Sequence, residues 1–162
     1  MRFSYECSDC NKVYQSEEVM YQCPDCSQQN EKGSFSKGNL IVKLNKDDLV
    51  KLAKQDHVSM FDFFPYSIPN PEVFPVGGTP LARPHRLGLK YGLKNLCCKL
   101  DSALPSGSFK DRASLLIAAQ VIAHRQNRIA LASTGNAGAA MSCAGAAYGL
   151  EIILFVPATA PI

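Results

Sequence analysis

SFKDRASLLIAAQVIAHRQ, residues 108–126, is the stretch that decides the fold, because its apolar residues recur at helical spacing and predict a long helix. Short apolar segments on either side, NLCCKLD (95–101) and RIALAST (128–134), are expected to be strands. A small-residue helix (136–149) and a third strand (151–157) follow. Strands that alternate with helices and are apolar throughout indicate an α/β fold, a parallel sheet with helices on both faces.

Two unusual motifs follow the first two of these strands. SGSFK (106–110) comes after the first, and STGNAG (133–138) comes after the second. Ligands bind at the carboxyl ends of the strands in sheets of this kind. The glycines and alanines of STGNAG would let the backbone approach a ligand closely, although small residues also serve tight helix packing. The motif is neither G-x-x-x-x-G-K-[ST] nor G-x-G-x-x-G, which disfavours nucleotide binding.

Lys110 occupies the first turn of the expected long helix, where the helix dipole disfavours a positive charge. Ser108 could cap this helix, and Asp111 follows three residues later, close to the pattern of a capping box. The dipole and partial removal from water would favour the neutral amine, which is the form that a Schiff-base nucleophile needs. The alternative is a solvated lysine that opens an ordinary helix.

Four cysteines near the N-terminus form the pattern C-x2-C-x12-C-x2-C, within a short repeat of Y-E-C-S-D-C and Y-Q-C-P-D-C. Two such knuckles can close a tetrahedral thiolate site, and the pattern predicts structural zinc bound by Cys7, Cys10, Cys23 and Cys26. With four protein ligands no position is left open for catalysis. Iron in the same cage, two C-x-x-C redox pairs and simply buried cysteines are the alternatives.

The sequence divides into three segments. Residues 1–36 are expected to form a zinc-ribbon-like module whose tyrosines pack a thin sheet, and metal must supply stability that so short a segment lacks. Residues 37–94 should hold one amphipathic helix (45–55), capped by Asn45, and an irregular proline-rich strap (57–84). Residues 95–162 make up the α/β body.

Composition restricts the function further. The chain has a net charge of +3, yet residues 1–32 carry more acidic than basic side chains. An acidic N-terminal module does not fit nucleic acid, whereas a mildly basic body fits small anionic ligands. No segment is apolar and long enough to cross a membrane, and no export signal is visible. Seven cysteines without such a signal favour metal or free thiols over disulfides, and we expect a cytoplasmic protein.

Three segments together resemble a known family: VGGTPLARPHRLG (76–88), CCKLDSALPSGSFKDRAS (97–114) and ALASTGNAGAAMSCAGAAYGLEIILFVPATAP (130–161). They follow one another as in the pyridoxal-phosphate enzymes of the tryptophan-synthase-β fold type, and the match is closest to the threonine synthase family. Some members related to threonine synthase carry a zinc-ribbon-like N-terminal extension. Two positions depart from the usual pattern, since Val76 and Asp101 stand where the family usually has glutamate.

The resemblance implies roles for individual residues. Lys110 matches the lysine that holds pyridoxal 5'-phosphate covalently and later moves protons. Asn136 matches the asparagine that contacts the pyridine 3'-hydroxyl, while Phe109 and Asp111 match structural positions. The loop that receives the substrate carboxylate corresponds to Ser133, Thr134, Gly135, Asn136 and Ala137.

The reaction implied is conversion of O-phospho-L-homoserine and water to L-threonine and phosphate, with an amino-acid substrate and possible homo-oligomers. Another replacement or elimination, such as cysteate synthesis or threonine dehydration, is the alternative within the class. A non-catalytic zinc-ribbon interaction protein is the alternative outside it. Family members carry later in the chain a glycine-rich loop for the cofactor phosphate and a partner for the pyridine nitrogen, and neither has a counterpart here. We therefore expect this chain to be the front part of an enzyme, inactive by itself.

Overall fold

The computed structural model describes residues 2–160, which fall into two compact units that divide after Pro65. The first unit carries the cysteine pattern, and the second carries the two long helices. Each unit is described by itself below. Among the described residues, no helix combines the length and the apolar character needed to cross a bilayer.

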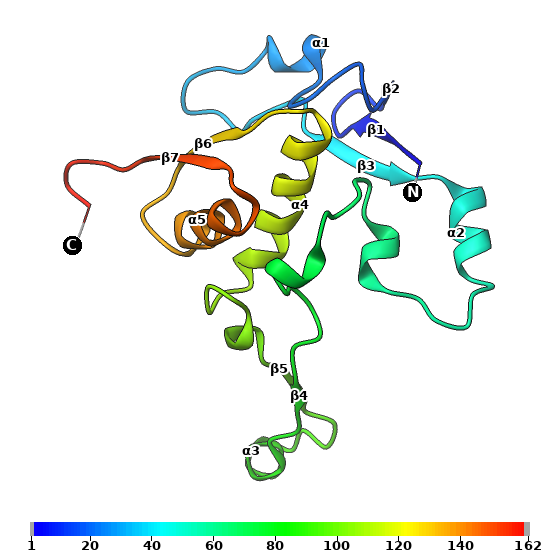
Figure 1. The fold of residues 1–162 in the computed structure, drawn as a ribbon, viewed down its shortest axis with the longest axis vertical. Coiled ribbons are helices and arrows are strands. Elements are labelled where there is room, and N and C mark those ends of the chain that lie inside the picture. The colour runs from blue at the N-terminus through cyan, green and yellow to red at the C-terminus, as the bar shows by residue number, and fades with distance from the viewer. Residues whose placement is uncertain (1, 161–162) are drawn as a thin grey trace. The chain divides into compact units, whose positions relative to one another are not determined.

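The first unit is built on a three-stranded antiparallel sheet with the order β2-β1-β3 (Figure 1). Its strands are β1 (Phe3–Cys7), β2 (Val13–Gln15) and β3 (Leu40–Leu44), and a short helix, α1 (Pro24–Ser27), carries the second cysteine pair. Along β1 the side chains of Tyr5 and Cys7 are buried, as the two-residue period of a strand requires. The core of the unit is small, and it contains Tyr5, Cys7, Tyr14, Val19, Cys23 and Cys26.

Residues 37–94 contribute more to this unit than the sequence predicted. β3 pairs with β1 over its whole length, from Phe3 opposite Leu44 to Cys7 opposite Leu40. The sheet therefore continues past residue 36, the end expected for the module. Helix α2 (Lys46–Leu52) follows, and the side chain of Asn45 accepts a hydrogen bond from the Asp48 amide (3.2 Å), which confirms the predicted cap.

The strap between the units is mostly irregular, as expected, with single turns of 3-10 helix at η1 (Met60–Phe63) and η2 (Pro71–Val73). A short helix, α3 (His85–Tyr91), lies between strands β4 (Leu81–Ala82) and β5 (Cys98–Lys99) and was not predicted. It ends at Gly92, which adopts a left-handed conformation.

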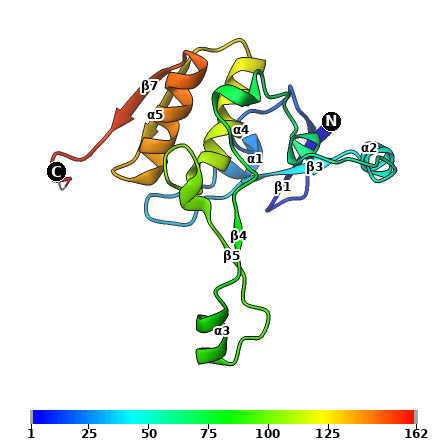
Figure 2. The same cartoon turned by 60° about the horizontal axis from the view of Figure 1, so that its bottom comes forward.

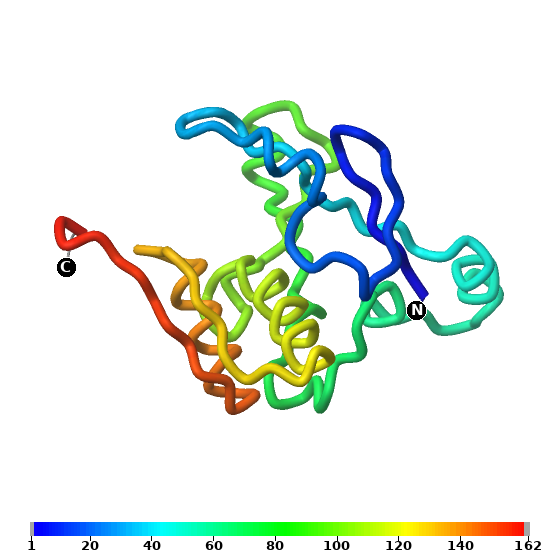
Figure 3. Tube along the Cα trace, turned by 90° about the horizontal axis from the view of Figure 1, so that it is seen from above, coloured from blue at the N-terminus to red at the C-terminus, as the bar shows by residue number. Residues whose placement is uncertain are grey.

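The second unit contains the expected alternation of helices and strands. After a 3-10 turn, η3 (Asp101–Ala103), come α4 (Lys110–Ala123), β6 (Arg128–Ala132), α5 (Asn136–Tyr148) and β7 (Glu151–Phe155). Strands β6 and β7 are parallel and in register from Arg128 opposite Glu151 to Ala132 opposite Phe155; Figure 3 shows them running side by side. Helix α5 makes the crossover and packs on β7, and α4 packs against α5 (Figure 2).

The strand predicted at 95–101 is not part of this parallel sheet. Only Cys98–Lys99 is extended, and it pairs antiparallel with Leu81–Ala82, with a further bond from the Leu100 amide to the Pro80 carbonyl (2.9 Å). The proline-rich segment before it thus offers a hairpin partner that local sequence patterns did not reveal. Within the described residues the parallel sheet has two strands, so the expectation that SGSFK follows a parallel strand is wrong. Helices on both faces of a larger sheet remain a prediction.

Candidate functional site

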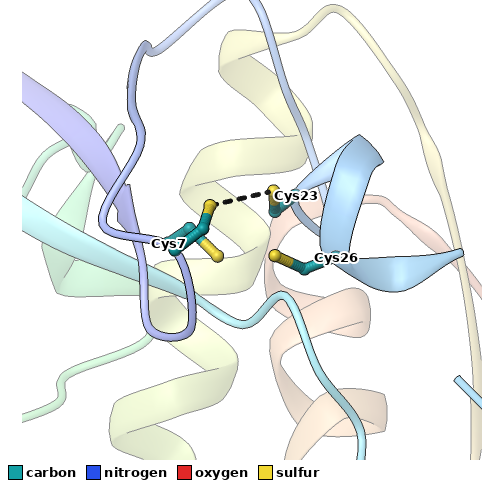
Figure 4. A group of neighbouring side chains, drawn as sticks. Cys7, Cys23 and Cys26 are labelled. Atoms are coloured by element: carbon teal, nitrogen blue, oxygen red, sulfur yellow. Dashed lines mark hydrogen bonds between the residues drawn. The ribbon is translucent and has the colours of Figure 1, made fainter. Parts of the chain in front are cut away.

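The four cysteines converge in the first unit. Cys7 ends β1, Cys10 lies in the following turn, Cys23 precedes α1 and Cys26 lies within it. Their four sulfur atoms all lie within 4.8 Å of one another, and all but Cys10 are buried. Figure 4 shows Cys7, Cys23 and Cys26 with their sulfurs gathered between the end of β1 and α1.

This geometry fits a tetrahedral metal site. Metal–sulfur bonds of about 2.3 Å in a regular tetrahedron place the sulfurs about 3.8 Å apart. The Cys10 and Cys23 sulfurs are 3.8 Å apart. Because this pair already has the tetrahedral spacing and all four sulfurs lie within 4.8 Å of one another, the side chains could close around an ion with little movement.

Backbone bonds shape the two knuckles that present the cysteines. In the first, the Asn11 amide donates to the Cys7 carbonyl (3.0 Å), and Asn11 has a left-handed φ of 59°. In the second, the Cys23 amide donates to the carbonyl of Gly38 (2.8 Å). Gly38 has a φ of +80°, and a Cβ there would lie 3.2 Å from the Cys23 carbonyl oxygen, so the close approach requires glycine.

Hydrogen bonds to sulfur make the four cysteines unequal. The Tyr14 hydroxyl lies 3.0 Å from the Cys23 sulfur, and the Asp9 amide donates to the Cys7 sulfur at 3.4 Å. The contact with Tyr14 is the main reason why the pKa of Cys23 is lowered to about 6, whereas hydrogen bonding with Cys10 and burial raise the pKa of Cys26. The sequence predicted only a packing role for Tyr14, and spacing offered no sign that its hydroxyl would reach a cysteine.

Lys110 begins α4 and is half-buried, with its ammonium 4.1 Å from the centre of the Phe109 ring. The Ser108 hydroxyl accepts from the Lys110 amide (3.3 Å), but the residue at the N-cap position is Phe109, so the cap predicted at Ser108 is wrong by one residue. The capping box does not form, because the Asp111 carboxylate, fully buried, instead accepts from the Ser106 amide (2.8 Å). Asp111 therefore anchors the loop before Lys110, which suits the structural role expected for it.

Arg112, the second cation of this turn, has a partner that the sequence did not reveal. Its guanidinium donates to both carboxylate oxygens of Asp101 (2.8 and 3.1 Å) and to the Thr79 hydroxyl (3.3 Å). The Thr79 hydroxyl donates to Asp101 as well (2.8 Å), and the bonds from Arg112 and Thr79 lower the pKa of Asp101 to about 2. The network joins two segments of the family resemblance, because Thr79 lies in the first and Asp101 and Arg112 lie in the second. The acidic residue at 101 was the signal that could have revealed it.

Residues 133–137 lie between β6 and the first turn of α5. Thr134, Gly135, Asn136 and Ala137 are exposed, whereas Ser133 is half-buried. The Ser133 hydroxyl accepts from the amides of Gly138 (2.9 Å) and Gly135 (3.3 Å), so it stabilises the loop and the helix start. The first amides of a helix have no partner within it. Ser133 already accepts from those of Gly135 and Gly138, so the exposed residues Asn136 and Ala137 carry the amides that a ligand could use.

Lys110 and this loop therefore stand at the N-termini of two helices that pack against each other. Among residues 2–160 no hydrogen bond joins Lys110 to residues 133–137. The donor set nevertheless fits part of a pyridoxal-phosphate site, because it offers a lysine amine, an exposed asparagine amide and the backbone N–H groups of exposed residues at a helix start.

Comparison with protein families matches residues 73–162 to the pyridoxal-phosphate dependent enzymes, and the chain belongs to this family. The match covers the hairpin, both long helices and the loop between β6 and α5. It confirms the family resemblance and the α/β class predicted from the sequence.

The curated relatives point to one enzyme within that family. The chain is 32% identical to the threonine synthase of Methanosarcina acetivorans over 96% of its own length, and 29% identical to that of Methanocaldococcus jannaschii over 93%. A threonine synthase from Halalkalibacterium halodurans is 38% identical over 50% of this chain. The chain spans 37% of the length of each of the two archaeal relatives. The similarity to them extends into the cysteine-bearing segment.

Proposed function

We propose that the protein is a threonine-synthase-like enzyme that converts O-phospho-L-homoserine and water to L-threonine and phosphate. The proposed activity is that of a chain as long as the relatives. The observation that carries the proposal is the pairing of two helix starts within the family match, with Lys110 at one and the 133–137 loop at the other. The relatives' names support threonine as the product. Cysteate synthesis or threonine dehydration would use the same residues.

Each residue has a separate task in this proposal. Pyridoxal phosphate, when bound, supplies an electron sink for the substrate's α-carbon. Lys110 holds the cofactor and moves the proton at that carbon, Asn136 contacts the pyridine 3'-hydroxyl, and the loop amides bind the substrate carboxylate. A carboxylate is favoured there because the N-terminus of α5 carries partial positive charge.

Covalent trapping tests the role of Lys110. Borohydride reduction of the gene's full-length product with pyridoxal phosphate should fix the cofactor to Lys110, and Lys110→Ala should abolish the adduct. Lys94→Ala, which removes an exposed lysine outside the two helix starts, should leave it unchanged. Peptide mass spectrometry locates the modified lysine, and an adduct at any other lysine would refute the assignment. Formation of both threonine and phosphate from O-phospho-L-homoserine, with no 2-oxobutyrate or ammonia formed from threonine, separates the proposed reaction from dehydration.

We also propose that the four clustered cysteines bind one structural zinc ion. Their burial and spacing support it, and the small core around them leaves few other sources of stability. Elemental analysis should find one zinc per chain, and Cys26→Ser should remove it whereas Cys97→Ser, outside the cluster, should not. Iron in place of zinc would contradict the choice of metal, and a metal-free protein with a well-ordered N-terminal unit would contradict the site.

A further inference from the structure

Tyr14 lies against the metal-binding cysteines in a way that sheet packing alone does not require. It is paired with Tyr5 across the sheet, only 6% of its surface is exposed, and its hydroxyl is 3.0 Å from the Cys23 sulfur. The Lys12 ammonium lies 5.2 Å from the centre of its ring and forms an ion pair with Asp25 (2.9 Å), which lies between Cys23 and Cys26 in the second knuckle. Two residues that follow the first knuckle thus contact the second one. Tyr14 does so through the Cys23 sulfur and Lys12 through the Asp25 carboxylate.

The direction of the Tyr14 hydrogen bond follows from the chemistry of metal binding. A cysteine that binds a metal does so as a thiolate and carries no proton. The hydroxyl must then be the donor, and the bond is charge-assisted because the acceptor is negative.

The four ligands differ in what else holds them. Cys23 has the buried Tyr14 hydroxyl, and Cys7 has the Asp9 amide at 3.4 Å. Cys10 is exposed to solvent. If a buried donor is lost, water cannot easily take its place. Loss of the Tyr14 hydroxyl should therefore leave the Cys23 sulfur without that hydrogen bond, whereas water could replace a donor lost from an exposed sulfur.

We propose that Tyr14 is a positioning residue of the metal site, whose hydroxyl donates to the Cys23 thiolate, fixes its orientation and slows release of the metal. The proposal rests on the proposed zinc site. Outer-shell partners of metal ligands commonly contribute about 10–100-fold to metal affinity, and Tyr14 is the tyrosine placed to act in this way.

The matched pair Tyr14→Phe and Tyr21→Phe tests the role of the hydroxyl. Phenylalanine keeps the buried ring of Tyr14, while Tyr21 is 79% exposed and serves as the control. Tyr14→Phe should release zinc to a chromophoric chelator roughly tenfold faster than the unmodified chain, and it should shift the sulfur-to-metal charge-transfer band of the cobalt(II) form. Tyr21→Phe should change neither.

Equal release rates and identical cobalt spectra for the folded Tyr14→Phe chain would overturn the proposal. If Tyr14→Phe does not fold, the unmodified chain loaded with ¹¹³Cd decides the question. A slowly exchanging Tyr14 hydroxyl proton with scalar coupling to cadmium supports the bond, and a hydroxyl that exchanges as fast as that of Tyr21 contradicts it. Failure of the unmodified chain to bind zinc, cobalt or cadmium would instead refute the metal site itself.

Discussion

At the scale of single residues, the first turn of α4 holds two cations with different environments. A helix N-terminus disfavours positive charge, and Arg112 offsets this by bonding to the carboxylate of Asp101. Lys110 has its ammonium over the Phe109 ring and no carboxylate partner within the described residues. This difference fits a division of tasks, in which Arg112 holds the turn and Lys110 stays available for chemistry.

The Asp101 network predicts how stability depends on pH. The pKa of Asp101 is about 2 in the folded chain, below the value of about 3.9 for an unfolded aspartate. Its contribution is therefore fully present above about pH 4 and is lost as the pH falls toward 2. In urea titrations followed by circular dichroism, Asp101→Asn should lower the midpoint at pH 6 and reduce the difference between pH 6 and pH 2.5.

Asp56→Asn, which removes an exposed carboxylate from the first unit, is the control and should behave like the unmodified chain. If Asp101→Asn shows the same loss between pH 6 and pH 2.5 as the unmodified chain, the ion pair with Arg112 does not contribute to stability. Arg112→Lys should only partly preserve the contribution, because a lysine cannot make the paired bonds of the guanidinium.

At the scale of elements, the contact between α5 and β7 depends on small residues. Gly145 is buried in the last turn of α5, and a Cβ there would lie 2.7 Å from Cδ1 of Ile152 and 3.2 Å from the Leu150 carbonyl oxygen. The Leu150 amide also bonds to the Gly145 carbonyl (2.9 Å), which fixes the turn from helix to strand. Helix and strand therefore approach more closely than a larger residue would allow.

Gly145→Ala should destabilise the second unit. Overpacking costs about 1–3 kcal/mol, and the better helix propensity of alanine returns about 1 kcal/mol. The expected net loss is about 0–2 kcal/mol of unfolding free energy, measured by urea titration. Ala146→Ser, at an exposed position of the same turn, should change stability by less than about 0.5 kcal/mol. If the Gly145→Ala variant were more stable than the unmodified chain, the Ile152 side chain would have to move aside at little cost in free energy.

The elements also show what sequence could predict. The α4 segment was predicted from its helical period, whereas β6 and β7 were predicted as short apolar runs and α5 as a small-residue segment that ends at Gly149, whose φ is 68°. Strands β3 and β5 owe their partners to segments distant in the sequence, which periodicity does not report. The cysteine cluster was visible from spacing alone, whereas the bond from Tyr14 to Cys23 depends on the register of β1 with β2.

At the scale of the whole molecule, the two units are stabilised in different ways. The first has a core of six buried residues, three of which are cysteines. The second buries apolar residues of its own two long helices, including Leu115, Ala118, Met141 and Ala144. Removal of a metal should therefore destabilise the first unit and leave the stability of the second unit unchanged.

Chelation of the zinc-loaded chain tests this difference directly. Without an ion, three buried thiols and a thin sheet cannot offset the entropy of ordering the first unit, so that unit should unfold. Hydrogen exchange should then rise by orders of magnitude at the amides of Tyr5 and Tyr14, while those of Met141 and Ala144 keep their protection. Cys7→Ser should show the same rise in hydrogen exchange without chelator. Cys143→Ser, which changes a cysteine in α5, should leave the Tyr5 amide protected. Continued protection of the β1 and β2 amides after complete metal removal would show that the sheet is stable by itself, and that the cysteines serve another purpose.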